Sequence, residues 1–340
     1  MTSAPPTHPN RSPLSPEGPP RIGVLERNRL LGLRVGRVLR AALRLASVAV
    51  ADEPAALRAA LGPSPMLLLC DAADLDLALE WAQSRYPSMR IAVWTTGEMG
   101  PLLEAAAKHE AVVALLGVPP FGSMPRPWEL AALARRVNAA DPAPPHVQDL
   151  LLSGATLVKY RPQSSRDLHL AVSDAQMLAE RAGASTRVAQ RAGEVAHELL
   201  MNAMYDAPVD HYGNLLYSLD RKQQLSLALD EIPTFRFATD GMTLGLQVVD
   251  RFGRLRRQHV LDGIGRGRTA TQGAGNFLDT SAGGAGLGLS RMYTTATSLL
   301  VDVAAHRHTS VTVMFDLDIQ PRDARSVPSS LHLFAPGAGS

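Results

Sequence analysis

A proline-rich break divides this chain of 340 residues into two stretches with different hydrophobic patterns. Residues 141–145 read Asp-Pro-Ala-Pro-Pro, which neither a helix nor a central strand can cross, because proline lacks a backbone N–H and has a fixed φ. The length also suits two domains of average size, at about 150 residues each. We therefore expect two domains, joined by a linker over residues 141–163.

Before the break, short apolar runs alternate with segments whose apolar residues have helical spacing. The five apolar runs cover residues 22–25, 47–51, 66–70, 91–94 and 112–116. Strands separated by helices in this way are typical of βαβ units, which form a parallel sheet with helices on both faces. Residues 21–140 are therefore predicted to form one five-stranded α/β domain. Residues 1–20 hold seven prolines and almost no large apolar side chain, which predicts a disordered tail.

After the break, the order of the expected elements changes. Strands are expected at about 167–172, 235–239, 243–249, 300–304 and 310–317, and helices at 174–181, 186–206 and 289–300. The Asp-Gly step at 240–241 lies between two alternating apolar runs and is a strong hairpin signal. Helices segregated from a mostly antiparallel sheet predict an α+β two-layer sandwich over residues 164–318. Residues 319–340 are expected to be a C-terminal tail, with 331–334 as a docking segment.

Two polar side chains four residues apart mark the long helix expected at 186–206. Glu198 and Asn202 project from the same face, and Asp206 lies one turn further along. Such a carboxylate can orient a nucleophile, and an amide oxygen can join the shell of Mg²⁺, which accepts few protein ligands. Taken alone, a pair of this kind is more often a solvated polar stripe.

Two further sequence features are candidates for ligand binding: a glycine-rich motif and an isolated aspartate. Residues 283–289 read Gly-Gly-Ala-Gly-Leu-Gly-Leu, just before an expected helix. Closely spaced glycines let backbone N–H groups approach a polyphosphate at a helix N-terminus, where the helix dipole favours anions. Asp250 directly follows the strand expected at 243–249, where it can accept a hydrogen bond from an exocyclic amine or cap a turn.

In this order, the three motifs resemble those of the GHKL superfamily, the ATP-binding fold of histidine kinases, gyrase-type and Hsp90-type ATPases and anti-sigma-factor serine kinases. HELLMNA at 197–203 resembles the N box, VVDRFGRL at 248–255 the G1 box and GAGLGLS at 284–290 the G2 box. The resemblance implies that this domain binds ATP and Mg²⁺, with Asn202 as the metal ligand, Glu198 as the catalytic base and Asp250 at the adenine. It assigns cofactor binding to Asn202, Asp206, Asp250, Gly253, Gly284, Gly286, Leu287 and Gly288.

Two places depart from the GHKL pattern. Phe252 and Arg254 stand where the G1 box usually carries glycines, with Gly253 between them. His308-Thr309 replaces a glycine–threonine pair that often precedes the last strand. Residues 254–282 are rich in Gly, Thr and Ser and hold few large apolar side chains, so we expect a mobile lid there.

The elements before the N box resemble those of anti-sigma serine kinases, whose nucleophile is a hydroxyl on a partner protein. One hypothesis is therefore an ATP- and Mg²⁺-dependent protein serine/threonine kinase, in which Glu198 accepts the hydroxyl proton. The alternatives are a module that binds nucleotide without turnover and selects a partner by its occupancy, and a scaffold with an empty pocket. The implied partner is a signalling protein such as an anti-anti-sigma-like regulator, and residues 207–232 are a candidate partner surface.

The first expected domain resembles the flavodoxin-like receiver of response regulators, the proteins of two-component signalling. Asp71 ends the third expected strand, at the phosphoacceptor position, and Thr95 or Thr96 takes the position of the switch hydroxyl. The acidic pair after the first strand is reduced to Glu26, and the lysine after the fifth is replaced near residues 117–119. These losses imply a degenerate receiver, in which Asp71 is either a phosphoacceptor or a structural residue.

Composition excludes several classes of protein. With 46% hydrophobic and 19% charged residues the chain can bury a core, and its one cysteine, Cys70, cannot form a disulfide framework. No apolar run approaches the roughly 18 residues of a membrane span. A net charge of +2 gives no strong field to attract nucleic acid. We expect a cytoplasmic protein, and the sequence leaves a homodimer open.

Overall fold

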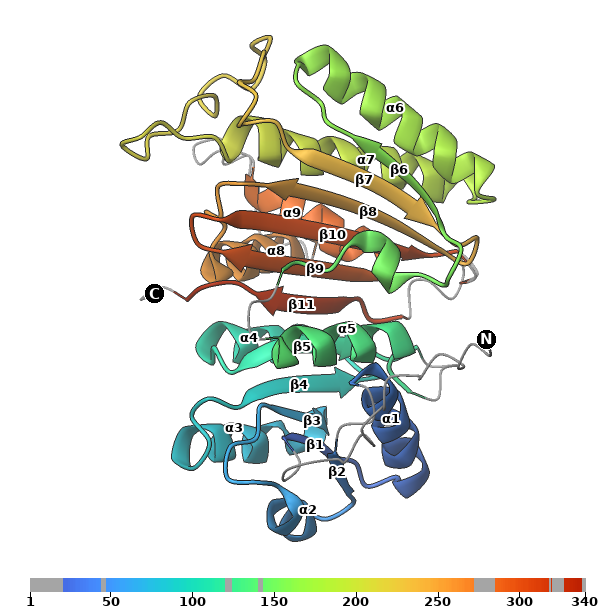
Figure 1. The fold of residues 1–340 in the computed structure, drawn as a ribbon, viewed down its shortest axis with the longest axis vertical. Coiled ribbons are helices and arrows are strands. Elements are labelled where there is room, and N and C mark those ends of the chain that lie inside the picture. Colours follow the sequence, from blue (N-terminus) through green and yellow to red (C-terminus); the bar gives the residue numbers. More distant parts are fainter. Residues whose placement is uncertain are drawn as a thin grey trace, which may run out of the picture.

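The computed structural model describes residues 21–43, 47–119, 124–139, 143–271, 285–317, 319 and 327–337. In this part of the chain, eleven strands form one continuous sheet in the order β2-β1-β3-β4-β5-β11-β9-β10-β8-β7-β6. Figure 1 shows the N-terminal half of the chain at the bottom of the view and the C-terminal half at the top. The protein is therefore a mixed α/β protein. The tail expected at residues 1–20 lies outside the described residues.

The N-terminal half contains a parallel sheet with helices on both faces, as expected. Its strands are β1 (Ile22–Leu25), β2 (Val48–Ala51), β3 (Leu67–Asp71), β4 (Arg90–Thr95) and β5 (Val112–Gly117). Its helices are α1 (Arg29–Ala42), α2 (Pro54–Ala60), the short η1 (Ala72–Asp74), α3 (Leu75–Ser84), α4 (Gly100–Lys108) and α5 (Pro127–Asn138). Because α1 and α5 pack on one face and the other helices on the opposite face, the strands are apolar on both sides.

The C-terminal half contains an antiparallel sheet with its longer helices packed into one apolar cluster. Its strands are β6 (Thr156–Tyr160), β7 (Thr234–Thr239), β8 (Thr243–Asp250), β9 (Ser298–Ala304) and β10 (His308–Asp316). Its helices are η2 (Val147–Leu150), α6 (Ser165–Arg181), α7 (Thr186–Met201), the π-helical turn η3 (Asn202–Asp206), α8 (Arg257–Thr271) and α9 (Ala285–Thr295). Of the helices in the described ranges, none combines the length and apolar character that crossing a lipid bilayer requires.

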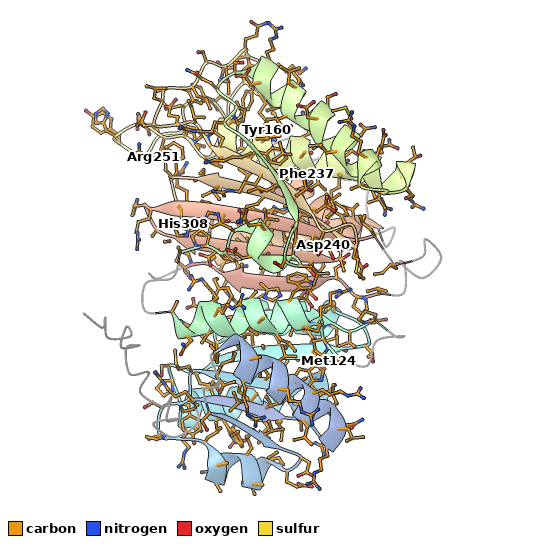
Figure 2. The ribbon with its side chains drawn as sticks, turned by 45° about the vertical axis from the view of Figure 1, so that its right-hand side comes forward. Met124, Tyr160, Phe237, Asp240, Arg251 and His308 are labelled. Atoms are coloured by element: carbon orange, nitrogen blue, oxygen red, sulfur yellow. The ribbon has the colours of Figure 1, made fainter. Side chains whose placement is uncertain are left out.

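The hairpin predicted from the Asp-Gly step is confirmed, because β7 and β8 pair in antiparallel register. Gly241 in the turn has a φ of +85°, a conformation that glycine adopts without steric cost. Figure 2 shows Asp240 at this end of the sheet, and Arg251 and His308 at the other end. The residues that follow β8 therefore lie beside the start of β10.

The strand expected at residues 167–172 is wrong, because these residues belong to helix α6. Ser164 and Asp167 form a capping box that starts the helix. The Ser164 hydroxyl accepts from the Asp167 N–H at 3.2 Å, and the Asp167 carboxylate accepts from the Ser164 N–H at 3.0 Å. The buried residues of α6 have helical spacing and are Leu168, Ala171, Ala175 and Ala179.

Two segments without expected structure also form regular elements. The expected linker at 141–163 contains strand β6, which pairs with β7 at the edge of the sheet. The expected mobile lid at 254–282 is helical over α8, because Val260 and Ile264 bury one face of that helix. Residues 272–282 of that lid lie outside the described residues.

The C-terminal tail expected at 319–340 contains strand β11 (Ser330–Phe334), at the place where residues 331–334 were expected as a docking segment. Strand β11 pairs antiparallel with β5 and parallel with β9, and thereby joins the two halves into one sheet (Figure 1). Leu331 and Leu333 are 1% and 2% exposed. This strand forms because its apolar side chains are buried between segments that are distant in sequence.

A buried polar cluster accompanies β11 at the junction of the two halves. Glu129 on α5 is fully buried and accepts a hydrogen bond of 2.6 Å from the Ser298 hydroxyl. Its carboxylate also lies 3.7 Å from Arg126 and 3.8 Å from the ring of His332. Burial works to raise the pKa of Glu129, but His332 and Arg126 outweigh it, so that the pKa lies below its usual value.

Candidate functional site

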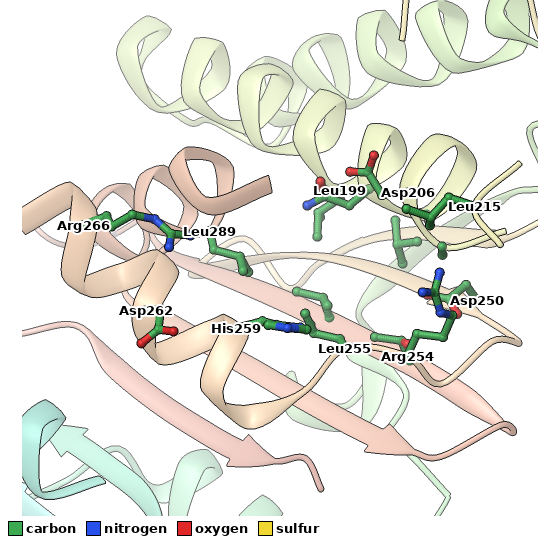
Figure 3. Close-up of a pocket in the computed structure, with 16 residues that line it drawn as sticks. Leu199, Asp206, Leu215, Asp250, Arg254, Leu255, His259, Asp262, Arg266 and Leu289 are labelled. Atoms are coloured by element: carbon green, nitrogen blue, oxygen red, sulfur yellow. The ribbon is translucent and has the colours of Figure 1, made fainter. Parts of the chain in front are cut away.

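A cavity of about 370 Å³ lies in the C-terminal half, between the end of α7, helix α8 and the face of the sheet (Figure 3). Its apolar wall consists of Leu199, Ala203, Ala207, Leu215, Val248, Leu255, Leu289 and Val311. Its polar lining consists of Asn202, Asp206, Asp250, Arg254, His259, Asp262, Arg266 and Thr309. A mostly apolar cavity with a few converging polar groups is typical of a small-molecule site.

Asn202 stands where α7 changes from α-helix to the π-helical turn η3. That turn is closed by the Ala207 N–H, which donates to the Asn202 carbonyl at 2.9 Å. The Asn202 side-chain oxygen Oδ1 is buried and has no hydrogen-bond partner among the described residues. Because an unpaired buried acceptor costs about 1–3 kcal/mol, this atom marks a position where a donor or a cation is favoured. Single π-turns inside helices are frequent at functional sites.

Asp206 lines the same cavity, one turn beyond Asn202. Its carboxylate accepts from the Arg221 Nε at 3.1 Å and from the Arg221 Nη2. Burial raises the pKa of Asp206 above its usual value, and the charge of Arg221 opposes that shift. The carboxylate is therefore held by an arginine, unlike the free amide oxygen of Asn202.

Glu198 is not one of the described side chains that line the cavity. It lies one turn before Asn202 on α7 and points toward the start of α9, because a Cβ atom added to Gly288 would be 2.5 Å from its Oε2. Glycine at 288 thus allows the backbone of α9 to approach this carboxylate. The structure brings Glu198 and Gly288 together, as their assignment to one site requires.

The other residues of the glycine motif lie at or before the start of α9 in the sequence. Gly284 lies outside the described residues, and Gly286 and Leu287 belong to the first turn of α9. The next residue, Leu289, is buried and lines the cavity. Helix α9 thus begins at the edge of the cavity.

Asp250 is the last residue of β8 and is 7% exposed. Its carboxylate accepts a hydrogen bond of 2.8 Å from the Phe252 N–H, and its neighbour across the strands is Thr309 on β10. Burial raises the pKa of Asp250 to about 6, against the effect of the hydrogen bonds from Phe252, Gly253 and Thr309. This cavity wall therefore carries a carboxyl group that changes charge near neutral pH.

Gly253 does not line the cavity among the described residues, although the G1 resemblance assigns it to cofactor binding. Its φ of +63° is the left-handed region, and an added Cβ would be 2.1 Å from the Ala304 carbonyl oxygen. This glycine therefore lets the turn after Asp250 pack against the end of β9.

The residues that α8 and the segment before it contribute to the site were not predicted from the sequence as site residues. His259, Asp262 and Arg266 line the cavity at spacings of three and four, and therefore share one face of α8. Leu215, Arg254 and Leu255 complete the lining. The apolar pair Val260 and Ile264 at i, i+4 was the available signal for this helix, and the surrounding glycines obscured it.

Asp71 lies at the carboxyl end of β3 in the N-terminal half, on the side where Glu26 follows β1. Its Oδ1 accepts from the Ala73 N–H at 2.9 Å and caps η1, while Arg27 pairs with Asp74 at 2.7 Å. Burial raises the pKa of Glu26, and the charges of Asp71 and Asp74 add to this shift. Thr95 at the end of β4 accepts from the Gly97 N–H at 2.9 Å.

Comparisons with known proteins add little to this geometry. No protein-family model and no curated protein matches the chain. A chain in the crystal structure of the SiaB–SiaC complex from Pseudomonas aeruginosa is similar at 16% identity, over 46% of this chain and 88% of that chain, with a TM-score of 0.29. A likeness this low carries no inference about fold or function.

Proposed function

We propose that the cavity in the C-terminal half binds ATP together with Mg²⁺, as its resemblance to the GHKL superfamily implies. The observation that carries this proposal is the buried, unpartnered Oδ1 of Asn202, in the same cavity as the carboxyl group of Asp250. Both residues stand at the positions that the N box and the G1 box assign to the ion and to the adenine. The protein would then be a nucleotide-dependent regulator that acts on a signalling partner.

The side chains at the cavity fit a magnesium ion. Mg²⁺ takes oxygen ligands, is bound by one or two protein groups and completes its shell with phosphate oxygens and water. The Asn202 Oδ1 offers such an oxygen, whereas the Asp206 carboxylate is held by Arg221. Asn202 would therefore be the direct protein ligand.

The two ends of the cavity also differ in the way that a nucleotide requires, with an apolar surface at one end and positive charge at the other. Figure 3 shows Asp250 at one end, and Arg266 with Leu289 at the other. At the first end, Val248 and Val311 form an apolar surface for a base, and Asp250 can accept from its exocyclic amine. At the second end, Arg266 and the N-terminus of α9 provide positive potential for the phosphates.

For catalysis, Glu198 would take a proton from a hydroxyl of the partner protein during transfer of the γ-phosphoryl group. The ion would offset the negative charge on the phosphate oxygens. Glu198 stands one turn from Asn202 and against Gly288, which supports this role. Because Glu198 does not line the described cavity, the non-catalytic hypothesis of a nucleotide-gated interaction module stands beside the kinase.

For the N-terminal half, we propose a degenerate receiver-like domain. The strand order β2-β1-β3-β4-β5 is that of flavodoxin-like folds, which supports the resemblance. The Asp71 carboxylate is engaged as a cap, and the Arg27–Asp74 pair lies beside it. These contacts favour a structural role for Asp71 over phosphorylation.

Calorimetric titration with ATP and Mg²⁺ tests nucleotide binding. The wild type should bind, and Asn202→Ala should weaken binding by about tenfold or more, equivalent to about 1.4 kcal/mol. Asn138→Ala at the exposed end of α5 is the matched control and should bind like the wild type. Absence of heat with the wild type, or equal affinity in Asn202→Ala, would overturn the proposal.

A second experiment separates the two hypotheses once binding is seen. Radiolabelled γ-phosphate on a co-purified partner, lost in Glu198→Gln and kept in Glu194→Gln, would select the kinase. Glu194 is an exposed residue one turn earlier on α7 and serves as the control. Nucleotide binding without any transfer of label would select the interaction module.

A further inference from the structure

Helix α8 links the proposed nucleotide site to the N-terminal half of the protein. One face of the helix carries His259, Asp262 and Arg266 into the cavity. Its first residue, Arg257, extends in another direction and is only 5% exposed. The Arg257 Nη2 donates to the carbonyls of Ala106, Val112 and His109, at 2.7, 2.6 and 3.3 Å.

These three acceptors belong to the corner where α4 ends and β5 begins. Of the three, the Ala106 carbonyl belongs to the last turn of α4, where carbonyls have no donor within the helix, so the guanidinium satisfies it and complements the helix dipole. Burial lowers the pKa of Arg257 to about 10, with the charge of Glu110 acting against this shift and that of Arg90 adding to it. Burying a guanidinium group is costly, and the bonds to the carbonyls offset that cost.

The backbone of the same residue is fixed as well. The Arg257 N–H donates to the Pro336 carbonyl at 3.2 Å, in the segment that follows β11. The first turn of α8 is thus bound to α4, β5 and the end of β11. The cavity-lining His259 is only two residues further along the same helix.

We propose that Arg257 is a positioning residue for the cavity, which couples nucleotide binding to the α4–β5 corner of the N-terminal half. The coupling to nucleotide rests on the proposed function. A nucleotide that contacts α8 favours the position in which Arg257 is docked, and docking in turn favours the nucleotide. Loss of the guanidinium frees the first turn of α8 and moves the cavity wall.

Hydrogen exchange without nucleotide tests whether Arg257 links α8 to the α4–β5 corner. In Arg257→Met, which keeps an apolar stem of similar length, exchange should become faster both in residues 106–112 and in residues 259–266. Arg256→Ala changes an exposed arginine at the preceding position and should leave both segments as in the wild type. Arg257→Lys should restore part of the protection, because an ammonium group can still donate to the same carbonyls. Exchange in Arg257→Met equal to that of the wild type would overturn the inference.

The ligand-bound experiment uses ATP and Mg²⁺ with the same variants. In the wild type, nucleotide should slow exchange in residues 106–112, which do not line the cavity. In Arg257→Met this remote protection should disappear, and the affinity should fall by about fivefold or more, a coupling of about 1 kcal/mol. Leu331→Ala serves as a variant that lowers stability at the junction but should keep the affinity.

The outcomes separate the inference from the proposed function. If the wild type binds nucleotide and residues 106–112 exchange unchanged, or if Arg257→Met binds as the wild type does, the inference is overturned. If Arg257 had only a structural role, Arg257→Met would lower the melting temperature but would leave the affinity and the remote protection intact. If the wild type binds no nucleotide, the proposed function fails, and the nucleotide-free comparison alone decides whether Arg257 positions α8.

Discussion

At the scale of single residues, Asp250 predicts how nucleotide affinity depends on pH. Its pKa is raised to about 6 by burial, so it is mostly ionised at pH 7 and mostly protonated at pH 5. Protonation turns one oxygen of the carboxyl group into a donor, so the ionised form accepts a hydrogen bond from an exocyclic amine more readily. The affinity for ATP and Mg²⁺ should therefore be constant above neutral pH and fall as the pH drops through about 6, as measured by calorimetry.

Asp250→Asn is the control for this pH dependence. It keeps the size of the side chain and cannot ionise, so it should bind more weakly at pH 7. Any pH dependence that remains in it belongs to the phosphates of the ligand and to other ionisable groups of the cavity, such as Asp206. Equal pH profiles for Asp250→Asn and the wild type would contradict the assignment of Asp250.

Two glycines near the site should respond to alanine in different ways. At Gly253, an added Cβ meets the Ala304 carbonyl at 2.1 Å with a φ of +63°, so Gly253→Ala should destabilise the fold by more than about 1 kcal/mol. At Gly288, the added Cβ meets the movable carboxylate of Glu198. Gly288→Ala should therefore change the free energy of unfolding by less than about 1 kcal/mol, because alanine also favours helix. Urea denaturation compares the two variants, and equal losses of stability would contradict this reading.

At the scale of elements, a helix or strand could be predicted from the sequence only where its own local pattern of apolar residues showed that it is buried. The strands of the N-terminal half are apolar on both faces and were therefore visible as runs, such as β3 and β5. Helix α7 was visible because Ser185 caps it and its apolar face repeats regularly. Its π-turn at Asn202 was not visible, since it depends on packing rather than on local spacing.

Strands β6 and β11 could not be predicted, for a related reason. Each has five residues and pairs with segments far away in the sequence. Of the candidate site, the resemblance to GHKL motifs implied that Asn202, Asp206 and Asp250 belong to one site, and the three line one cavity. The contribution of α8 could not be predicted, because glycine lowers helix propensity and this helix is stabilised by contacts with segments distant in sequence.

The importance of β11 leads to a prediction about the element as a whole. Leu331 is 1% exposed and lies opposite Leu115 on β5 and Leu299 on β9. Leu331→Ala should therefore cost about 2–5 kcal/mol of unfolding free energy, the usual range for a buried leucine. Leu219→Ala, at a leucine that is 98% exposed, should cost almost nothing. Denaturant unfolding measures both, and similar small losses would show that β11 adds little to the sheet.

At the scale of the whole molecule, buried charges hold the two halves together at the junction. Arg136 on α5 donates to Asp302 on β9, and Asp302 also lies 3.2 Å from the ring of His308. Glu129 on α5 accepts from Ser298 on β9 and lies near His332 on β11. Breaking one partner of such a buried pair commonly costs about 3–5 kcal/mol, because the other charge is left without compensation. We therefore expect the two halves to unfold together.

Glu129 allows this expectation to be tested by pH and by substitution. Because its pKa is lowered in the folded state, its contribution to stability is present above its usual pKa and is lost as the pH falls below it. Glu129→Gln should lower stability at pH 7 and flatten its decline toward low pH, whereas Glu104→Gln, at an exposed position on α4, should change neither. Trp81 and Trp94 report on the N-terminal half and Trp128, which stacks on His332, reports on the junction, while circular dichroism reports on both halves. In the wild type the two transitions should coincide, and in Glu129→Gln they should separate; two separate transitions in the wild type would contradict a single cooperative unit.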